Sequence, residues 1–327
     1  MKTPSLKWYF TREINSLDQR FRGFHAMYFV QVLWTCIAFH FLLFSAGLCP
    51  AYAFTDWTPL IQRLAADQFE EKEMRLLFSH PGVMFDPDAM STKLKELIRN
   101  RFHTTRPASP AIRSEIYDRF LEEPMISEAR SFTQKNIATL EEIEKAYCVP
   151  KEIVVAILLV ETELGGYLGS RPAFNTLASM ASSTSLDIIL PHLPSGLITP
   201  ETSDFAMKRC RQRADWAYRE LKALIRYASQ SSVDPLSIPG SMYGAIGISQ
   251  FMPSNISVYG IDANNDGHID LFAVDDALFS TANFLYHHGW KCNISRPKKR
   301  KVIMAYNRST IYANTVLQVA DTLRQRN

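Results

Sequence analysis

The sequence predicts a mainly α-helical globular protein. Across most of the chain, apolar residues recur three and four positions apart with charged residues between them, which is the spacing of one face of a helix. Runs that alternate apolar and polar residues, as strands do, are scarce. The 327 residues are 46% apolar and 21% charged, so the chain can bury a sizeable core, and the disordered and collagen-like classes are excluded.

The first part of the chain differs from the rest. Residues 26–48 carry no charge, five basic side chains precede them, and Ala-Tyr-Ala follows at 51–53. These are the parts of a secretory signal peptide, so we predict that residues 1–53 direct export and are cleaved after Ala53. The alternative is that residues 26–48, which are long enough to span a bilayer, stay as a membrane anchor. In both cases the chain from Phe54 onward is exported.

The small net charge of the chain argues against binding of a partner through long-range electrostatic attraction. The whole chain carries a net charge of +3, and residues 54–327 hold 31 basic and 31 acidic side chains. The predicted mature chain is therefore neutral, which speaks against a nucleic-acid partner and against attraction to a charged membrane surface. It keeps three cysteines, Cys148, Cys210 and Cys292. Their odd number and irregular spacing predict buried thiols, with one incidental disulfide at most, and no zinc site.

The mature chain begins with amphipathic helical patterns. They place apolar residues three and four apart, with charges between them. Two prolines at 103–111 break helical continuity and predict a connection there. The patterns cover residues 57–68, 92–102, 114–123 and 136–147.

The later part of the chain is also mostly helical by pattern. Pro150 suits the first turn of a helix that should run to Leu164 and stop at two glycines. Residues 182–203 are rich in Ser, Thr and Pro, and we expect a surface loop or insertion. Amphipathic helices are expected over 209–230 and 307–326. The whole pattern predicts one compact unit or a helical lobe around a smaller core.

One carboxyl group is expected to lie against the core. The middle of the helix that begins at Pro150 is apolar on all sides and therefore buried, and Glu161 shares a face with Val154, Ile157 and Leu158. Burial and the negative end of the helix dipole both disfavour ionisation of Glu161. A carboxyl group that stays protonated near neutral pH can act as a general acid. The alternative is a structural ion pair with an arginine.

Residues 240–254, GSMYGAIGISQFMPS, combine glycines with neutral polar and aromatic side chains. Gly240, Gly244 and Gly247 suit positive φ angles or close backbone approach. Hydroxyl and amide groups beside aromatic rings suit a neutral polar ligand such as a sugar. The glycine spacing differs from that of a phosphate-binding loop, and no lysine follows. The alternative is a glycine-rich entry to a helix, with no ligand.

Residues 262–270, DANNDGHID, match the start of an EF-hand calcium loop. Such loops place oxygen ligands at positions 1, 3, 5, 7 and 9 and a glycine at position 6, as this segment does. Ala273 stands where the bidentate Glu should be, and Asp275 or Asp276 could supply the missing carboxylate. The alternative is a turn of Asn and Asp residues that binds nothing.

Five motifs, in this order, resemble the membrane-bound lytic murein transglycosylase B family: ETELG, GSMYGAIGISQFMPS, DANNDGHIDLF, ANFLYHHGW and AYNRSTIYA. The likeness runs from about Tyr147 to the C-terminus. It implies a lysozyme-like fold with an EF-hand-like calcium loop at 262–276, in a catalytic domain over 54–327. That domain has a helical part at 54–147 and a core at 148–327. The resemblance further implies a periplasmic enzyme that cleaves the β-1,4 bond between N-acetylmuramic acid and N-acetylglucosamine of peptidoglycan without adding water.

The resemblance also implies roles for individual residues. Glu161 would be the single catalytic acid and base, and the muramoyl 6-hydroxyl would be the nucleophile, which gives a 1,6-anhydro product. Where the family tends to have tyrosine, this chain has Trp216, which can still stack on a sugar, and Phe284, which lacks the hydroxyl. The other expected sugar-site residues are Arg213, Ser241, Gln250, Tyr306, Asn307 and Tyr312. The expected Ca2+ ligands are Asp262, Asn264, Asp266, the carbonyl of His268, and Asp276.

Two other functions stay open on the sequence alone. If Glu161 were an ion-paired core residue, the protein would be a non-catalytic, calcium-stabilised wall-binding protein. If water reached the anomeric carbon, the enzyme would be a hydrolytic muramidase. The basic run at 296–301, RPKKRK, is expected to be a solvated loop or, at most, a contact to anionic wall polymer.

Overall fold

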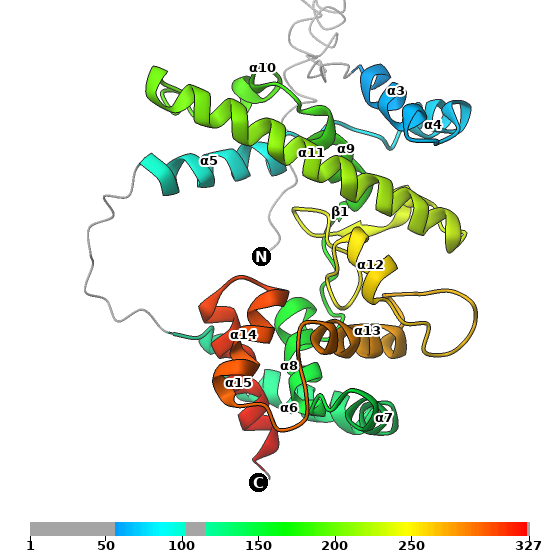
Figure 1. Ribbon diagram of the computed structural model, residues 1–327, viewed down its shortest axis with the longest axis vertical. Helices are drawn as coiled ribbons and strands as arrows, with labels where there is room; N and C mark the ends of the chain where they lie inside the picture. The colour runs from blue at the N-terminus through cyan, green and yellow to red at the C-terminus, as the bar shows by residue number, and fades with distance from the viewer. Residues whose placement is uncertain (1–55, 103–114, 326–327) are drawn as a thin grey trace, which may run out of the picture. The chain divides into compact units, whose positions relative to one another are not determined.

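The computed structural model describes residues 56–102 and 115–325 (Figure 1). These residues are mainly helical, which confirms the predicted class. The predicted export segment at 1–53 and the connection at 103–111 lie outside the described residues. Within the described ranges, no helix is both long and apolar enough to cross a bilayer.

The helices follow the amphipathic patterns at most positions. The pattern at 114–123 is an exception, because its described part forms only a short 3-10 turn and the α-helix comes after it. The elements are α3 (Thr58–Ala66), α4 (Glu71–Phe78), α5 (Asp88–Phe102), η1 (Asp118–Leu121), α6 (Glu123–Lys135), α7 (Ile137–Tyr147), α8 (Lys151–Thr162), β1 (Arg171–Pro172), α9 (Ala173–Ser182), α10 (Leu186–Ile189), η2 (Leu190–His192), α11 (Pro200–Gln230), η3 (Pro235–Ser237), β2 (Pro239–Gly240), α12 (Pro253–Tyr259), α13 (Val274–His287), α14 (Arg296–Tyr306) and α15 (Thr310–Arg324).

Helix α8 is the central element of one part of the core. Its residues 153–159 are all buried, and α6, α7, α13 and α15 pack around it (Figure 1). A helix that is apolar on all sides needs such a cover. The helix ends at Thr162, because the next three residues have positive φ angles of 51°, 60° and 96°. This left-handed end turns the chain away one residue after Glu161.

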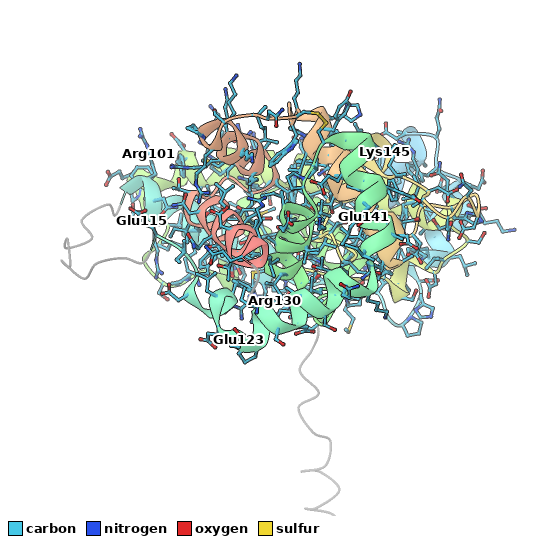
Figure 2. The ribbon with its side chains drawn as sticks, turned by 90° about the horizontal axis from the view of Figure 1, so that it is seen from below. Arg101, Glu115, Glu123, Arg130, Glu141 and Lys145 are labelled. Atoms are coloured by element: carbon cyan, nitrogen blue, oxygen red, sulfur yellow. A yellow bond between two sulfur atoms is a disulfide. The ribbon has the colours of Figure 1, made fainter. Side chains whose placement is uncertain are left out.

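The outer helices α6 and α7 show the amphipathic pattern in three dimensions. Ile126 and Leu140 are fully buried in the core. Glu123, Glu141 and Lys145 are exposed and project from the outer side of these helices (Figure 2). The outer surface therefore carries charges of both signs.

Helix α11 organises a second group of helices, since α5, α9 and α12 pack against it. It begins at Pro200, nine residues before the predicted pattern. The expectation of a loop over 182–203 is therefore wrong in part, because this stretch also contains α10 and η2. Thr199 and Thr202 cap α11 reciprocally. Ser, Thr and Pro mark a helix start here, which composition alone does not distinguish from a loop.

A small antiparallel sheet joins the segment after α8 to the glycine-rich segment. Strand β1 pairs with β2, with Arg171 opposite Gly240. Gly169, just before β1, has a φ angle of +98°, and a Cβ atom there would lie 2.0 Å from the Gly240 carbonyl oxygen. Only glycine allows the two segments to approach this closely.

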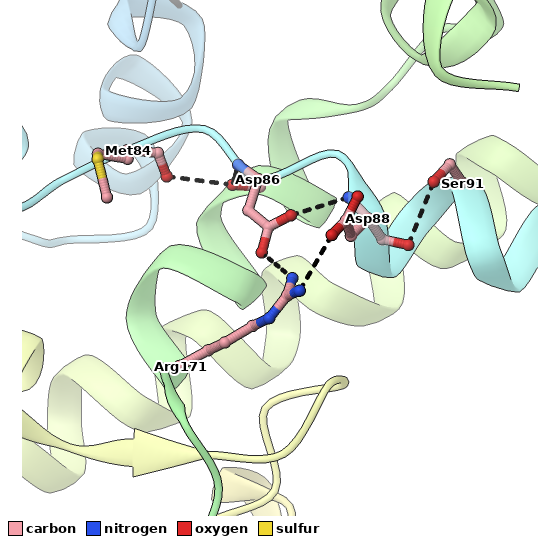
Figure 3. Close-up of polar contacts among 6 residues, drawn as sticks. Met84, Asp86, Asp88, Ser91 and Arg171 are labelled. Atoms are coloured by element: carbon pink, nitrogen blue, oxygen red, sulfur yellow. Dashed lines mark hydrogen bonds and ion pairs between the residues drawn. The ribbon is translucent and has the colours of Figure 1, made fainter.

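Arg171 also connects this sheet to the start of α5. Its guanidinium pairs with Asp86 and, at 3.0 Å, with Asp88 (Figure 3). The backbone amide of Asp86 in turn donates to the Ser179 hydroxyl at 2.8 Å. The N-terminal helices are therefore held against α9 and β1 by charge-assisted hydrogen bonds as well as by apolar packing.

The basic run at 296–301 is helical, so the expectation of a loop there is wrong. It forms the first half of α14, with Ser295 at the N-cap and Pro297 in the first turn. Val302 and Ile303 are buried, and α14 packs against α13 and α15 (Figure 1). Tertiary packing of this face stabilises a helix whose first half has little apolar pattern of its own.

A disulfide links Cys148 and Cys292, so the expectation of buried thiols is wrong for these two cysteines, although the sequence left room for one such pair. The indole Nε1 of the buried Trp290 donates to the Cys148 carbonyl at 2.9 Å and holds the two segments together. Cys210 is buried and free. The two bonded cysteines are 144 residues apart, so no local spacing could reveal the pair.

Replacing both bonded cysteines, Cys148→Ser with Cys292→Ser, should lower the free energy of unfolding by about 2–4 kcal/mol, because the cross-link restricts a long loop of the unfolded chain. Urea unfolding measures this loss. Reductant should bring the wild type to the stability of the double variant. The control, Cys210→Ser, should stay sensitive to reductant. A wild-type midpoint that reductant leaves unchanged contradicts the prediction.

Candidate active site

Glu161 lies in the last turn of α8, above the buried residues of that helix. Glu161 is half-buried, so part of it stays accessible to a ligand. Protein packs densely around its carboxyl group, and this burial raises the pKa of Glu161 from 4.5 to about 7, while a hydrogen bond from the Tyr312 hydroxyl acts in the opposite direction. Glu161 is therefore largely protonated just below neutral pH, as the sequence predicts.

The geometry does not support the ion-pair alternative. In the described part of the chain, no Lys, Arg or His nitrogen lies within 4.0 Å of the Glu161 carboxyl group. Glu163 leaves the helix with a φ angle of 51° and pairs instead with Arg119 at 3.4 Å. The two carboxyl groups thus have different surroundings although only one residue separates them.

Hydrogen bonds fix the end of α8 against the glycine-rich segment. The Thr162 hydroxyl donates to the Ile248 carbonyl at 2.8 Å and accepts from the Gly165 amide at 3.0 Å. The Ile248 amide donates to the Leu271 carbonyl at 2.8 Å. At Gly247, with a φ angle of +75°, a Cβ atom would lie 2.4 Å from the Leu271 Cβ. Glycine is therefore required where this segment passes the end of the acidic loop.

Two tyrosines complete the surroundings of Glu161. Tyr306 ends α14, and its hydroxyl donates to the Ser249 carbonyl at 2.5 Å. Tyr312 lies in the first turn of α15 and is 2% exposed. Burial, and then the nearby negative charge of Glu161, raise the pKa of both phenols well above their usual range. Both rings therefore lie close to the carboxyl group and stay neutral.

One buried hydroxyl group in this region, that of Ser249, lacks a hydrogen-bond partner among the described residues. The Tyr312 hydroxyl lies close enough to Glu161 to lower the pKa of its carboxyl group. Ser249 lies beside Tyr306 on the glycine-rich segment, and Thr281 lies on α13 close enough to Tyr306 to affect the pKa of its phenol. Unpaired buried hydroxyls cost stability and suit a site that receives polar groups from a ligand. No sequence pattern singled out Thr281, since its place depends on how α13 packs against α14.

The other predicted sugar-site residues are spread over the neighbouring segments. The Ser241 hydroxyl accepts from the amides of Tyr243 and Ala245 and so holds a turn. Gln250 has a φ angle of 49°, and its side-chain amide donates to the Gly247 carbonyl. The remaining three are the partly buried Arg213 and Trp216 on α11 and the exposed Asn307 after α14.

Phe284, which lacks the hydroxyl of tyrosine, is almost fully buried beside this site. It packs edge-on against Tyr306, with ring centroids 4.8 Å apart. On another side it stacks on His288 at 4.0 Å. Its role in the structure is to support the Tyr306 ring.

The predicted calcium loop has the tight conformation that its sequence indicates. Gly267 has a φ angle of +90°, and Asp262 accepts from the amides of Asp266 and Gly267. Asp276, 1% exposed, accepts from the amides of Ala263 and Asp270 at the two ends of the loop. Within the described ranges, no group of three or more His, Cys, Asp or Glu side chains converges as a bound metal requires.

The donors in this loop nevertheless fit a hard divalent cation. They are oxygens of carboxylates, an amide and a carbonyl, which calcium prefers. Burial raises the pKa of Asp276, and the charges of Asp262 and Asp266 raise it further. This mutual repulsion is what a cation would relieve. Asp275, the other candidate from the sequence, accepts from Thr139 of α7 instead.

Replacing Glu161 by Gln should stabilise the protein more at high pH than at low pH. The folded pKa of about 7 lies above the ordinary 4.5, so wild-type stability falls as pH rises between these values. Between about pH 5 and pH 8 the variant should gain roughly 1–3 kcal/mol relative to wild type. Unfolding at each pH measures this gain. Glu163→Gln is the control and should follow wild type. Parallel curves for Glu161→Gln and wild type contradict the prediction.

The fold matches solved lytic transglycosylases. The soluble lytic transglycosylase SltB1 from Pseudomonas aeruginosa superposes with a TM-score of 0.59 at 23% identity, over 80% of this chain and 96% of that chain. The Escherichia coli lytic transglycosylase Slt35 in complex with calcium superposes with a TM-score of 0.61 at 21% identity, over 82% of this chain and 92% of that chain. At these identities the likeness shows the fold.

Sequence comparison shows the family. Membrane-bound lytic murein transglycosylase B of Escherichia coli (strain K12) is 32% identical over 146 residues, which are 45% of this chain. The match spans a third of that relative's length, 33%. The model of the transglycosylase SLT domain family matches residues 54–297, which is most of the chain. The resemblance drawn from the five motifs is thereby confirmed, and the chain belongs to the transglycosylase SLT domain family.

Proposed function

We propose that this protein is a peptidoglycan lytic transglycosylase. It cleaves the β-1,4 bond between N-acetylmuramic acid and N-acetylglucosamine and leaves 1,6-anhydromuramic ends. The observation that carries the proposal is the Glu161 carboxyl group, whose pKa of about 7 results from burial and which has no cationic partner among the described residues. Membership of the transglycosylase SLT domain family supports the same reaction.

Glu161 acts first as an acid and then as a base. The protonated carboxyl gives its proton to the glycosidic oxygen as the bond from that oxygen to the anomeric carbon breaks. The resulting carboxylate then takes the proton of the muramoyl 6-hydroxyl, whose oxygen bonds to the anomeric carbon of the same sugar. No water is consumed, and Glu161 returns to its protonated state.

An intramolecular nucleophile removes the need for a second catalytic carboxylate. Ordinary glycosidases flank the bond with two carboxyl groups. Among the described residues, no other carboxylate shifts the pKa of Glu161. The closest acid in sequence, Glu163, is paired with Arg119. A 6-hydroxyl held beside the anomeric carbon gains its reactivity from proximity instead.

Neutral polar and aromatic groups bind the sugar in this proposal. Tyr306 and Tyr312 lie beside Glu161. The unpaired Ser249 hydroxyl and the Thr281 hydroxyl beside Tyr306 add two further polar groups. Trp216 offers an aromatic face to a sugar ring. The other proposed contacts are Arg213, Ser241, Gln250 and Asn307.

We further propose that the acidic loop binds Ca2+. Asp262, Asn264, Asp266, the carbonyl of His268 and Asp276 would hold it. When bound, the ion neutralises the clustered carboxylates and stabilises the loop. Because the Leu271 carbonyl accepts from Ile248, a stable loop also supports the segment against which Glu161 is fixed. The calcium complex of Slt35 supports this assignment.

An exported location agrees with the chemistry of the chain. The Cys148–Cys292 disulfide persists in an oxidising compartment such as the periplasm. Peptidoglycan, the proposed substrate, also lies outside the cytoplasmic membrane. In this proposal residues 1–53 direct export, either as a cleaved signal or with residues 26–48 retained as an anchor.

Digestion of purified sacculi tests the reaction. The wild type should release muropeptides with anhydromuramic ends, which borohydride does not reduce and which are lighter by one water and two hydrogens than reduced hydrolysis products. Glu161→Gln should lower the release by about 10²–10⁴-fold, since it removes the acid and base. Mass spectrometry of the digest measures both effects.

The matched control for this digestion is Glu163→Gln, which should release anhydro products as wild type does. Reducing ends in the wild-type digest would identify a hydrolytic muramidase. No release at all would identify a non-catalytic wall-binding protein. Anhydro products that persist in Glu161→Gln would show that another group is the acid.

Thermal unfolding tests the calcium site. Calcium at about 100 times its Kd should stabilise the protein by about 2.7 kcal/mol, since only the folded state binds it. The double variant Asp262→Asn with Asp266→Asn should lose this response, whereas Asp275→Asn should keep it. A wild-type Tm that is the same with calcium and with chelator would refute the site.

A further inference from the structure

The strongest unassigned feature outside the catalytic centre is the basic half of α14. Five of the first six residues of this helix are Lys or Arg, and the helix holds no acidic residue. Lys298, Arg300 and Lys301 are exposed. We call these three residues the α14 basic patch.

The patch is not balanced by neighbouring carboxylates. In the described ranges, no carboxylate oxygen lies within 4.0 Å of these three side chains, whereas Arg296 pairs with Asp321. Lys299 differs again, since it is half-buried with its ammonium 5.9 Å from the Trp290 ring. Cations in the first turns of a helix oppose the helix dipole, so the patch does not serve the stability of α14.

The patch lies on the same helix as one residue of the proposed active site. Helix α14 ends at Tyr306, whose hydroxyl donates to the Ser249 carbonyl beside Glu161. Lys301 precedes Tyr306 by five residues, about 7.5 Å along the helix axis, and Lys298 by about 12 Å. The nearer distance is comparable to the Debye length of about 8 Å at physiological salt. A strand that leaves the site along α14 would therefore bring its charges within range of the patch.

We propose that the α14 basic patch binds carboxylate groups of the glycan strand whose neighbouring sugars occupy the active site. The inference rests on the proposed function, because it takes the occupant of the site to be peptidoglycan with carboxylate-bearing peptide stems. The predicted mature chain is neutral overall, so this local patch supplies the attraction. It makes recognition of the polymer dependent on salt, although the catalytic centre itself holds neutral groups.

Co-sedimentation with purified sacculi tests the proposal. The variant Lys298→Gln, Arg300→Gln, Lys301→Gln should bind native sacculi about tenfold more weakly at low salt, from the loss of three exposed charge contacts. Added salt should weaken wild-type binding more steeply than that of the variant. On sacculi whose carboxyl groups have been converted to amides, wild type and variant should bind alike.

The matched control removes three other exposed cations, Lys72, Lys135 and Lys145, as Lys72→Gln, Lys135→Gln, Lys145→Gln. It has the same net charge as the patch variant and should bind native sacculi as wild type does. Equal binding by the patch variant and wild type would overturn the proposal. So would a deficit of the patch variant that persists on amidated sacculi.

Two further readouts distinguish a membrane partner from the glycan strand and binding from catalysis. If the patch variant loses binding to vesicles of anionic phospholipid and keeps its binding to sacculi, the partner is a membrane surface and the proposal is wrong. Release of anhydro products is followed in the same samples. If the wild type releases none, the proposed function fails, while the binding comparison still decides whether the patch recognises carboxylates.

Discussion

The site depends on the contact between the end of α8 and the glycine-rich segment. The Thr162 hydroxyl donates to the Ile248 carbonyl, and the Ile248 amide donates to the Leu271 carbonyl beyond it. This chain of hydrogen bonds joins three segments that are far apart in sequence. Because Glu161 precedes Thr162 directly, the same contact fixes the position of its carboxyl group. Glycine at position 247 is the condition for the close approach.

The features that support the proposed catalytic role of Glu161 also lower the stability of the fold locally. Burial disfavours its ionised form, and the nearby Ser249 hydroxyl is buried without a partner among the described residues. Each of these features alone is unfavourable to folding. Their concentration around one carboxyl group is typical of a functional site, where structure is preorganised for a ligand. The apolar residues 153–159 of α8, which are buried on all sides of the helix, offset this loss of stability.

The neutral total charge of the predicted mature chain conceals a strong local separation of charge. The outer surfaces of α6 and α7 mix both signs (Figure 2), the loop at 262–276 gathers aspartates, and five of the first six residues of α14 are basic. Interactions between exposed charges fade over about 8 Å at physiological salt. A charged ligand therefore interacts with the nearest cluster of charges, which the net charge of the chain does not describe. The acidic loop and the basic half of α14 lie on either side of α13 in the sequence and carry opposite charges.

The sequence by itself determined the helical class, the burial of α8 and the place of Glu161 in its last turn. It also determined the oxygen pattern of the acidic loop and the order of the family motifs. These features follow from residues that are close in the chain, where helix periodicity and loop spacing act directly. Only the tertiary structure decided that Cys148 bonds Cys292, that 296–301 is helical, that Thr281 lies near Tyr306, and that Asp276 rather than Asp275 faces the acidic loop. Each of these depends on which distant segments pack together, and no local pattern of residue types encodes that.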